Sequence, residues 1–461
     1  MSQEIAKKIV VPHSRYRKFL IEGYEIMEKA DGVEIILKYS FDNAVKFRER
    51  LFFPGVEAGR VVMISEVLGR AVRGLLIVGG ISYYKAECTN EIDGIALEKE
   101  EKLFWEKVYK RGLGEFFYQN QIDFRELINF VNPVENLNKI TISDLSERAL
   151  LPLGGGKDSL VSAEILKKTG MDFCSFSLRD ADPIRQTAQA LGKPRIIVER
   201  ELDAQLFEMN KQGAYNGHVP ITGYISFLIA VAGLLYDYKY LVLSLEKSAN
   251  IGQLEFLGLD INHQYSKSEE FENDFRDYLK KHLGGGLEYF SLLRGYYELK
   301  IAKIFAELDS FDKYKDICTS CNANFKIIKD APSKLWCGKC PKCVFVFGIF
   351  APFIDRGKLI KMFGKNLFTD ETLFDLFEET WGIKNFKPFE CVGTFEESQL
   401  AIYLTSLKSE WQNDPLIKHF QEQIAIGKID INKIKSSQAA VMNLMDTPNV
   451  PLIFRKVLES L

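Results

Sequence analysis

Six consecutive residues of this sequence are of types that bind phosphate. They are three glycines, a lysine, an aspartate and a serine: Gly154, Gly155, Gly156, Lys157, Asp158 and Ser159. Residues 149–153 before them are apolar and predict the end of a buried strand, and the apolar residues after them recur at helical spacing. Glycines let the backbone approach an anion, and the amides at a helix start point at it. The pattern predicts a phosphate-binding loop between a strand and a helix. Residues 154–159 are called the glycine loop below.

The order of the six residues indicates which kind of loop this is. Lys157 is followed by Asp158, which excludes the G-x-x-x-x-G-K-[ST] loop, and the spacing does not fit G-x-G-x-x-G with an acidic ribose contact. The segment resembles the S-G-G-x-D-S loop of the PP-loop ATP pyrophosphatases, which bind the diphosphate end of ATP and adenylate an oxygen of their substrate. Gly154 stands where that family most often has Ser. A glycine-rich turn before an ordinary helix is the alternative interpretation.

Composition sets the broad class of protein. The length of 461 residues allows about two to four domains, and a hydrophobic content of 46% is ordinary for a globular protein. A net charge of −3 argues against a partner that is a nucleic-acid duplex. No secretory signal is recognisable, and the longest apolar runs, residues 225–236 and 344–353, reach about half of the roughly 20 residues that span a bilayer. We therefore expect a cytoplasmic protein without a membrane partner; nothing indicates its oligomeric state.

The pattern along the chain predicts an α/β protein with three successive regions. Residues 1–145 are expected to form an N-terminal α+β domain, residues 146–355 the domain of the glycine loop, and residues 356–461 a mainly helical region. In the first region, residues 32–39, 61–64 and 75–84 have strand composition.

Strands and helices alternate in the second region. Strands are predicted at residues 173–178, 195–198 and 240–245, with helical patterns between them, which indicates a parallel sheet with right-handed crossovers. The polar segments 179–182 and 246–250 follow two of these strands. Since ligands bind beyond the carboxyl ends of such strands, we expect both segments to converge with the glycine loop.

Four isolated side chains are further candidates. His218 and His263 stand in polar loops before predicted helices, where a ligand or catalytic role competes with a structural one. Arg294 opens a predicted helix and either holds a carboxylate or phosphate or pairs with Glu298 on the surface. Cys391 lies in a polar loop and serves either as an acid/base or in packing. The aromatic segment 111–120 either lines a ligand site or fills a core.

Five of the eight cysteines lie close together in the sequence. They form two C-x-x-C pairs about 15 residues apart with one cysteine to spare: Cys318, Cys321, Cys337, Cys340 and Cys343. Such spacing is typical of a tetrahedral Zn²⁺ site, with Cys321, or else Cys318, as the fourth ligand beside the last three. The cluster also resembles the C-G-x-C-x-x-C site of the 7-cyano-7-deazaguanine synthases, which are PP-loop enzymes. Buried free cysteines or a sulfur-carrying pair are the alternatives.

Six segments together resemble one specific family. In chain order they are the glycine loop, Gly217-His-Val-Pro220, Asn262-His-Gln-Tyr-Ser-Lys-Ser268, Ser291-Leu-Leu-Arg294, Trp336-Cys-Gly-Lys-Cys-Pro-Lys-Cys343 and Pro388-Phe-Glu-Cys-Val-Gly-Thr394. This set resembles the UDP-N-acetyl-α-D-muramoyl-L-alanyl-L-glutamate epimerase family, within the PP-loop superfamily. The resemblance extends to about Thr394 and is weakest beyond it.

The resemblance implies an activity and roles for the candidates. It implies epimerisation of the terminal L-glutamate of the UDP-muramoyl-dipeptide through an acyl-adenylate, in peptidoglycan synthesis, with ATP and Mg²⁺ and release of AMP and diphosphate. Gly154, Gly155, Gly156, Lys157 and Ser159 would hold the phosphates, and Asp158 would orient the loop or contact Mg²⁺ through water. Lys157, Arg294 or Lys267 would offset charge on the transferring AMP, and His218, His263 and Cys391 would be candidates for the two-sided proton exchange. A PP-loop ligase or thiolase with another carboxylate, a purine-like compound or tRNA as acceptor, or a non-catalytic nucleotide sensor, are the competing hypotheses.

Overall fold

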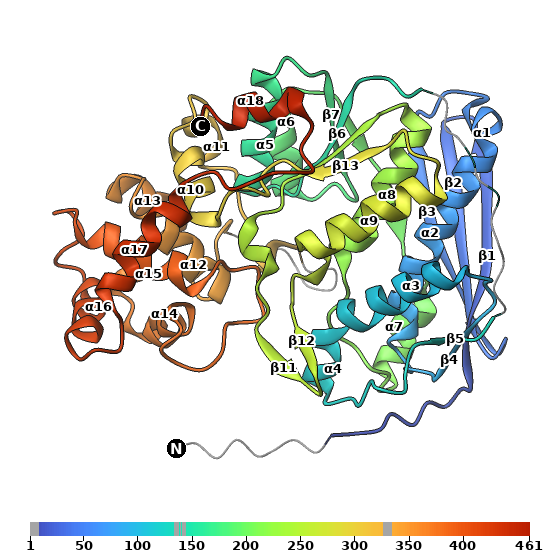
Figure 1. Cartoon of the computed structure of the whole chain (residues 1–461), viewed down its shortest axis with the longest axis horizontal. Helices are drawn as coiled ribbons and strands as arrows, with labels where there is room; N and C mark the ends of the chain where they lie inside the picture. The colour runs from blue at the N-terminus through green and yellow to red at the C-terminus, as the bar shows by residue number, and fades with distance from the viewer. Residues whose placement is uncertain (1–8, 133–137, 139, 141–143, 326–333) are drawn as a thin grey trace. The chain divides into compact units, whose positions relative to one another are not determined.

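The structure is a computed structural model that describes residues 9–132, 138, 140, 144–325 and 334–461. Figure 1 labels the helices and strands, which form a mixed α/β fold, as the alternation in the sequence predicts. The chain divides into two compact units: unit 1 comprises Met1–Leu150, Ile196–Leu241 and Leu254–Tyr289, and unit 2 comprises Leu151–Arg195, Val242–Gln253 and Phe290–Leu461. Each unit combines separate stretches of the chain, so this division does not test the three successive regions expected from the sequence. Those regions stay a prediction.

Unit 1 contains a six-stranded sheet with the strand order β5-β4-β1-β2-β3-β9. β1 (Lys18–Lys29) pairs antiparallel with β2 (Gly32–Phe41), and β2 pairs antiparallel with β3 (Val45–Pro54). The turn from β2 to β3 contains Asp42 and Asn43 with φ of 50° and 57°, a backbone conformation that these residue types tolerate. The strand predicted at residues 32–39 is therefore confirmed.

The remaining elements of unit 1 are the other strands of this sheet, a two-stranded sheet and helices. They are α1 (Arg60–Met63), α2 (Ser65–Tyr84), β4 (Glu91–Asp93), α3 (Lys99–Gly112), α4 (Gly114–Asn120), β5 (Asn129–Phe130), β9 (Glu199–Glu201), α7 (Ala204–Lys211), α8 (Ile221–Tyr236), β11 (Leu254–Phe256), β12 (Leu259–Ile261), η2 (Tyr265–Lys267) and α9 (Glu269–His282).

Two predicted strands of unit 1 are wrong. Residues 61–64 lie mostly in α1, and residues 75–84 form the second half of α2. Every residue from 74 to 84 is buried, so the run is apolar on all sides and has no period that separates a strand from a buried helix. Gly79 permits this packing, because a Cβ there would lie 2.6 Å from the hydroxyl of Tyr39 on β2.

A second, five-stranded sheet carries the glycine loop. Its order is β13-β10-β6-β7-β8, and β10 runs parallel to β6. The strands are β6 (Ala149–Pro152), β7 (Phe173–Ser177), β8 (Arg195–Ile197), β10 (Tyr240–Leu243) and β13 (Glu288–Ser291). The sequence predicted the first four, since each is a short apolar run bounded by polar or glycine residues.

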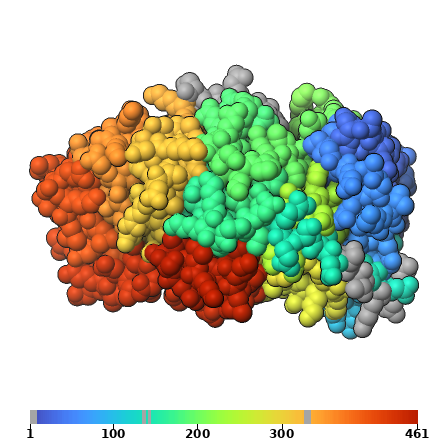
Figure 2. Space-filling view, turned by 90° about the horizontal axis from the view of Figure 1, so that it is seen from above, coloured from blue at the N-terminus to red at the C-terminus, as the bar shows by residue number. Residues whose placement is uncertain are grey.

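The remaining elements of unit 2 are helices. Its helices are α5 (Lys157–Lys168), α6 (Asp182–Leu191), η1 (Lys247–Asn250), α10 (Glu298–Ala306), α11 (Phe311–Tyr314), η3 (Asn322–Phe325), α12 (Pro341–Phe350), α13 (Arg356–Phe363), η4 (Leu367–Thr369), η5 (Glu371–Leu373), α14 (Phe374–Trp381), α15 (Phe395–Ser406), α16 (Pro415–Ala425), α17 (Ile431–Met442) and α18 (Leu452–Leu458). Both α10 and α18 pack on α5, and Figure 2 shows the red surface of the chain end beside the green surface of the α5 region. Every regular element from α13 onward in the described residues is a helix, while the region boundary at residue 356 stays a prediction.

The two longest apolar runs belong to buried helices, as predicted. They lie in α8 and in α12 with the residues that follow it, and nearly all residues of both helices are buried. Across the residues that the structure describes, no helix is both long and apolar enough to cross a membrane.

Candidate nucleotide and metal sites

The glycine loop lies between β6 and α5, where the sequence predicted it. Gly156 is the N-cap residue of α5, and the first-turn amides of a helix have no partner within the helix. Gly155 has a φ of +80°, and its carbonyl accepts a hydrogen bond of 2.9 Å from the amide of Thr319. A Cβ on Gly155 would lie 3.3 Å from the carbonyl carbon of Pro183, whereas a Cβ on Gly154 would meet no atom within 4 Å. The loop therefore needs a glycine at position 155 and offers open space at position 154.

The side chains of the loop divide into a buried and an accessible group. Lys157 is 3% exposed, and its ammonium donates to Asp158 Oδ1 at 2.6 Å and to the carboxylate of Glu298. Ser159 Oγ donates to the carbonyl of Gly156 at 3.1 Å. The side chain of Asp158 keeps 24% of its surface exposed. Asp158 is therefore the acidic group of the loop that a bound cation can reach, whereas Lys157 points into the protein.

Glu298 joins two lysines in the interior of unit 2. Lys342 Nζ lies 3.2 Å from the second carboxylate oxygen of Glu298 and also donates to the carbonyl of Cys391. Burial raises the pKa of Glu298, but the charges of Lys157 and Lys342 outweigh it, and the pKa is lowered. Burial lowers the pKa of Lys157, and the charges of Asp158 and Glu298 raise it further than burial lowers it. Glu298 and Lys157 are thus both held in their charged forms.

Segments that follow three different strands meet near the start of α10. Ser248, in the segment after β10, accepts a bond of 3.4 Å from the amide of Glu298 and donates to Glu397 at 2.7 Å. Arg294 is 2% exposed, and its Nη1 donates to the carbonyl of Glu246 at 2.9 Å. Together with the approach of Gly155 to Pro183, these contacts connect the glycine loop to the polar segments 179–182 and 246–250.

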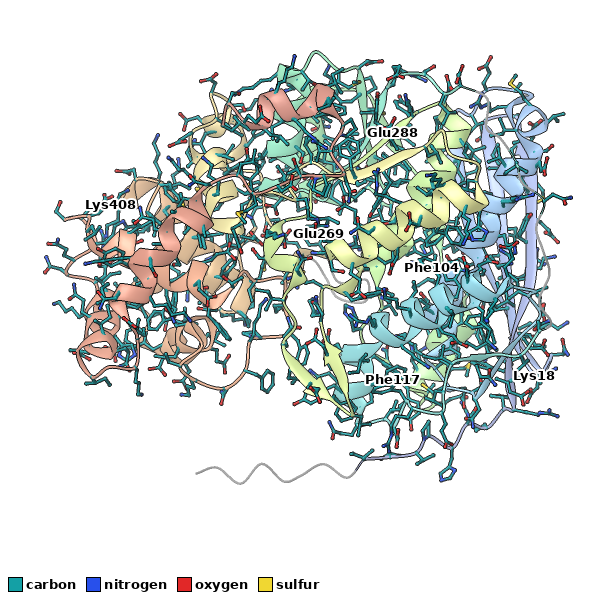
Figure 3. The ribbon with its side chains drawn as sticks, viewed as in Figure 1. Lys18, Phe104, Phe117, Glu269, Glu288 and Lys408 are labelled. Carbon is teal, nitrogen blue, oxygen red and sulfur yellow. The ribbon has the colours of Figure 1, made fainter. Side chains whose placement is uncertain are left out.

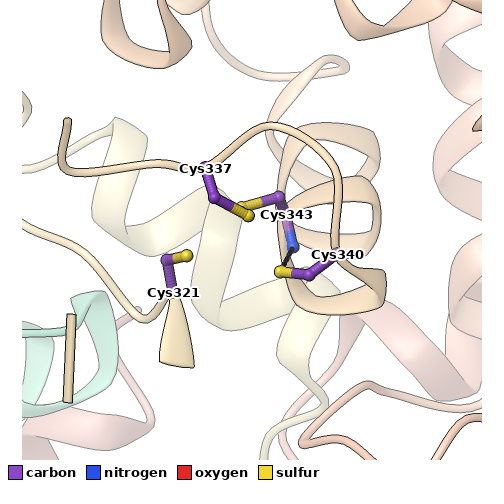
Figure 4. A group of neighbouring side chains, drawn as sticks. All are labelled: Cys321, Cys337, Cys340 and Cys343. Carbon is purple, nitrogen blue, oxygen red and sulfur yellow. Dashed lines mark hydrogen bonds between the residues drawn. The ribbon is translucent and has the colours of Figure 1, made fainter. Parts of the chain in front are cut away.

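Four cysteines form a cluster that fits one tetrahedral metal ion. The sulfur atoms of Cys321, Cys337, Cys340 and Cys343 all lie within 4.8 Å of one another, and Figure 4 shows them converging. The Cys337 and Cys343 sulfurs are 3.7 Å apart, close to the roughly 3.8 Å that a Zn–S bond of about 2.3 Å implies in a tetrahedron. Cys318 is buried and lies outside this group, so Cys321 is the fourth member. The arrangement is compatible with structural zinc.

The cysteine cluster is tied to the glycine loop by two connections. The Cys318–Cys321 segment donates to the loop through the amide of Thr319, as described above. On the other side, Lys342 lies between two cysteines of the cluster and pairs with Glu298, the partner of Lys157. An ion that fixes the four sulfurs would therefore also stiffen the loop.

Cys321→Ser is expected to remove the ion and to lower the melting temperature by about 10 °C. An ion at about 1,000 times its Kd stabilises a fold by about 4 kcal/mol, and each kcal/mol shifts the melting temperature by about 2–4 °C in a domain of this size. Metal content per chain and thermal unfolding measure the two effects. Cys318→Ser is the matched control, since it changes the other cysteine of the same pair and should keep the ion. If Cys318→Ser lost the ion and Cys321→Ser kept it, Cys321 would not be the fourth ligand.

A second group of possible metal ligands lies in unit 1. Glu115, His218 and His263 each offer a ligand atom within 4.8 Å of the others. Burial lowers the pKa of His218, and together with the charges of His263, Lys267 and Lys85 it brings the pKa to about 3. His218 is therefore neutral at physiological pH. The sequence singled out the two histidines but missed Glu115, which lies in the aromatic segment 111–120 without any signal of its own.

The other candidates have the following environments. Phe116 and Phe117 of the aromatic segment are fully buried, and Phe117, labelled in Figure 3, stacks on Phe124 with ring centroids 5.2 Å apart. These side chains fill a core, whereas Glu115 beside them joins the histidines.

Cys391 is half-buried in unit 2, and its carbonyl accepts a hydrogen bond from Lys342. His218 and His263 lie together in unit 1 and Cys391 lies in unit 2; their roles in proton exchange stay a prediction.

Known proteins resemble this chain over most of its length. The MurL N-terminal domain matches residues 11–292, and the MurL C-terminal domain matches residues 317–433. The UDP-N-acetyl-alpha-D-muramoyl-L-alanyl-L-glutamate epimerase of Xanthomonas oryzae pv. oryzae (strain MAFF 311018) is 36% identical over 391 residues, 84% of this chain and 86% of the relative. The protein of the same name from Micromonospora sp. (strain ATCC 39149 / NRRL 15099 / SCC 1413) is 38% identical over 416 residues, 88% of this chain and 92% of the relative.

A third relative extends this result. The protein of the same name from Salinispora tropica (strain ATCC BAA-916 / DSM 44818 / JCM 13857 / NBRC 105044 / CNB-440) is 37% identical over 352 residues, 76% of both chains. The matched residues include the glycine loop, both histidines and the cysteine cluster. On these grounds the chain belongs to the MurL family.

Proposed function

We propose that this protein is an ATP-dependent epimerase that converts the terminal L-glutamate of UDP-N-acetyl-α-D-muramoyl-L-alanyl-L-glutamate to D-glutamate. Three relatives carry the name of that epimerase, and each is similar to at least 76% of this chain. The substrate is a small nucleotide-sugar peptide of peptidoglycan synthesis, so no nucleic acid or membrane partner is part of the proposal. We place the reaction in the cytoplasm, where such a precursor would be made.

The observation that carries the ATP dependence is the glycine loop at the start of α5. Gly155 adopts a left-handed conformation that turns the chain from β6 into the helix, and the space above Gly154 is open. The amides of Lys157, Asp158 and Ser159 belong to the first turn of α5, where the positive end of the helix dipole attracts an anion. This arrangement supports the binding of a polyphosphate by backbone atoms more than by hydroxyl groups.

An adenylate solves the chemical difficulty of this epimerisation. The proton on the carbon next to a carboxylate is weakly acidic, because its removal would place a second negative charge beside the first. Attaching AMP to the carboxylate removes the first charge and leaves a carbonyl oxygen that can carry the second as an enolate. Hydrogen-bond donors placed at that oxygen would lower the barrier further.

The proposed steps balance as follows. A carboxylate oxygen of the glutamate attacks the α-phosphorus of ATP, and diphosphate leaves with the electron pair of the broken P–O bond. A base removes the α-proton, and an acid returns a proton to the opposite face. Water then adds to the acyl carbon, the bond to AMP breaks, and the D-glutamate carboxylate and AMP are released.

Residues of unit 2 would serve the first of these steps. Gly154, Gly155, Gly156 and Ser159 would hold the phosphates, and Asp158 would bind Mg²⁺, which neutralises phosphate charge in such sites. Lys157 is buried against Glu298, so its role would be to fix the loop and Asp158 rather than to touch the phosphates directly. Arg294 is buried beside Glu246 and would likewise position a segment of the site.

The proton exchange needs two groups on opposite faces of one carbon. His218, His263 and Cys391 are the candidates from the sequence. The two histidines direct their Nδ1 atoms at one oxygen of Glu115, an arrangement that suits a shared task better than two opposed ones. His218 is also a weak base at neutral pH because of its low pKa.

Incubation of the purified protein with ATP, Mg²⁺ and the L-glutamate precursor in D₂O tests the proposal. AMP and diphosphate are expected, together with deuterium at the α-position of a product glutamate that has the D configuration. A parallel reaction without ATP should leave the substrate free of deuterium, because the carboxylate form does not exchange.

Two outcomes would contradict the proposal. If deuterium entered the glutamate α-position without ATP, the epimerisation would not require an adenylate. AMP that forms only when ammonia or tRNA is added would favour a ligase or thiolase that uses the same loop.

A further inference from the structure

Three side chains from separate stretches of unit 1 meet at one point. Glu115 comes from the first turn of α4, His218 from the loop before α8, and His263 from the loop after β12. The Nδ1 atom of His263 lies 2.5 Å and that of His218 3.2 Å from the same oxygen of Glu115, Oε2. The two imidazole rings are 4.7 Å apart between centroids and are tilted by 49°.

The three ligand atoms lie near enough to one another to share one ion, although His263 and Glu115 stand at hydrogen-bond distance, 2.5 Å, and would separate on binding it. Ligands at about 2.0–2.1 Å from a tetrahedral centre stand about 3.3 Å apart, close to the His218–Glu115 distance of 3.2 Å. A pair of histidines that only donated hydrogen bonds to a carboxylate could use both of its oxygens. A common ion requires three ligand atoms that face one point, and these three atoms lie within 4.8 Å of one another.

The protein holds the histidine loops in place by polar contacts. Lys85 Nζ donates to the side-chain oxygen of Asn216 at 2.7 Å and to the carbonyl of Gly217 at 3.0 Å, directly before His218. Next to His263, the amide of Gln264 donates to the side chain of Asn262 at 2.7 Å. The side chains of Glu115, His218 and His263 keep 14%, 18% and 14% of their surface exposed. The three groups are therefore positioned in advance and remain accessible to a small ion.

We propose that Glu115, His218 and His263 bind a divalent first-row transition metal ion. Two imidazoles and one carboxylate suit Zn²⁺, Mn²⁺, Fe²⁺ or Co²⁺, whereas Mg²⁺ and Ca²⁺ prefer oxygen ligands alone. Three protein ligands leave at least one coordination position open. Lys85 and Lys267 lie near His218, and with the ion they outweigh the single charge of Glu115. The open position would therefore take an anionic oxygen ligand, such as a carboxylate or a phosphate.

This site is independent of the proposed adenylation and of the cysteine cluster. It lies in unit 1, whereas the glycine loop and the four cysteines lie in unit 2. Its ligands contain no sulfur, so the two sites differ in their spectra when both hold Co²⁺. Thiolate-bound Co²⁺ shows charge-transfer bands in the near ultraviolet, and Co²⁺ bound by nitrogen and oxygen shows only weaker visible bands.

Titration of the chelator-stripped full-length protein with Co²⁺ tests the proposal. The wild type is expected to show a visible spectrum that includes a component without thiolate bands. His218→Ala, His263→Ala and Glu115→Gln should each lose that component, with a Kd for the ion raised at least about 10-fold, while the thiolate bands persist. His13→Ala and Glu57→Gln are the matched controls, since they change an exposed histidine and an exposed glutamate of the same unit.

The controls make every outcome informative. If the component without thiolate bands is absent from the wild type, or survives in all three ligand variants, the metal site is wrong. Should an alanine variant fail to fold by circular dichroism, Glu115→Gln, which keeps the side-chain shape, decides in its place. Variants that lose epimerisation in a protein that binds no ion at this site would show that the three residues transfer protons instead.

Discussion

Glu298→Gln is expected to lower the free energy of unfolding by about 3–5 kcal/mol, because it leaves two buried lysines without their shared counter-charge. Glu298 is 1% exposed, and its two oxygens pair with Lys157 and Lys342, both of which are also buried. Glutamine keeps the shape of the side chain and removes only the charge. Urea unfolding of the variant and the wild type at neutral pH measures the difference.

The pH dependence of stability provides a second readout of the same substitution. The pKa of Glu298 lies below its ordinary value of 4.5 in the folded protein, because the lysine charges outweigh burial. A carboxyl group of this kind stabilises the fold above its ordinary pKa, and the stabilisation is lost as the pH falls through the lower, folded pKa. The wild type should therefore lose stability below pH 4.5 more steeply than Glu298→Gln does.

Glu307→Gln is the matched control for this prediction. Glu307 follows the last residue of α10, the helix that Glu298 begins, and its side chain is 60% exposed. Its replacement should change the free energy of unfolding by no more than about 0.5 kcal/mol. Equal effects of the two substitutions would show that the three buried charges do not stabilise one another.

The parts of this fold that the sequence predicted are those whose signals lie close together in the chain. The strand before Gly154, the helix after it and the strands at β7 and β10 each combine an apolar run with a polar or glycine boundary. The cysteine cluster was predictable for the same reason, because its spacing is local. The helical stretch in α2 was not, since a segment buried on all sides carries no periodic pattern.

The contacts that hold the candidate sites together could not be predicted from the sequence. Glu298 read as one half of a surface pair with Arg294, but it is buried and joined to Lys157, 141 positions earlier. Glu115 lies 148 positions from His263, and no pattern links them. Such pairings depend on how distant stretches fold together, and a single sequence does not record that.

These contacts also change how the glycine loop is understood. The sequence predicted that Lys157 binds the phosphates, yet its ammonium donates a hydrogen bond to Glu298. Glu298 also pairs with Lys342, which lies between two cysteines of the cluster. The carbonyl of Gly155 accepts a hydrogen bond from the amide of Thr319, within the Cys318–Cys321 segment. The backbone of the loop is thus fixed from two sides, so its shape should matter more than its side chains.

Gly155→Ser is therefore expected to lower diphosphate release from ATP by about 100-fold or more, whereas Gly154→Ser should change it by no more than about twofold. The φ of +80° at position 155 costs a residue with a side chain about 1–2 kcal/mol, and its Cβ would press on the backbone of Pro183 and Ile184 at 3.3–3.4 Å. The loop must shift to relieve this contact, and displacements of about 1 Å in an active site can cost about 100-fold in rate.

The same substitution one residue earlier controls for the added hydroxymethyl group. No atom lies within 4 Å of a Cβ on Gly154, and PP-loop enzymes most often have Ser at this position, so the variant should fold and bind ATP. Diphosphate release and the melting temperature, measured side by side, separate a displaced loop from an unfolded protein. If Gly155→Ser kept wild-type turnover, the backbone after β6 would not be the element that holds the nucleotide, since the added Cβ presses directly on that backbone.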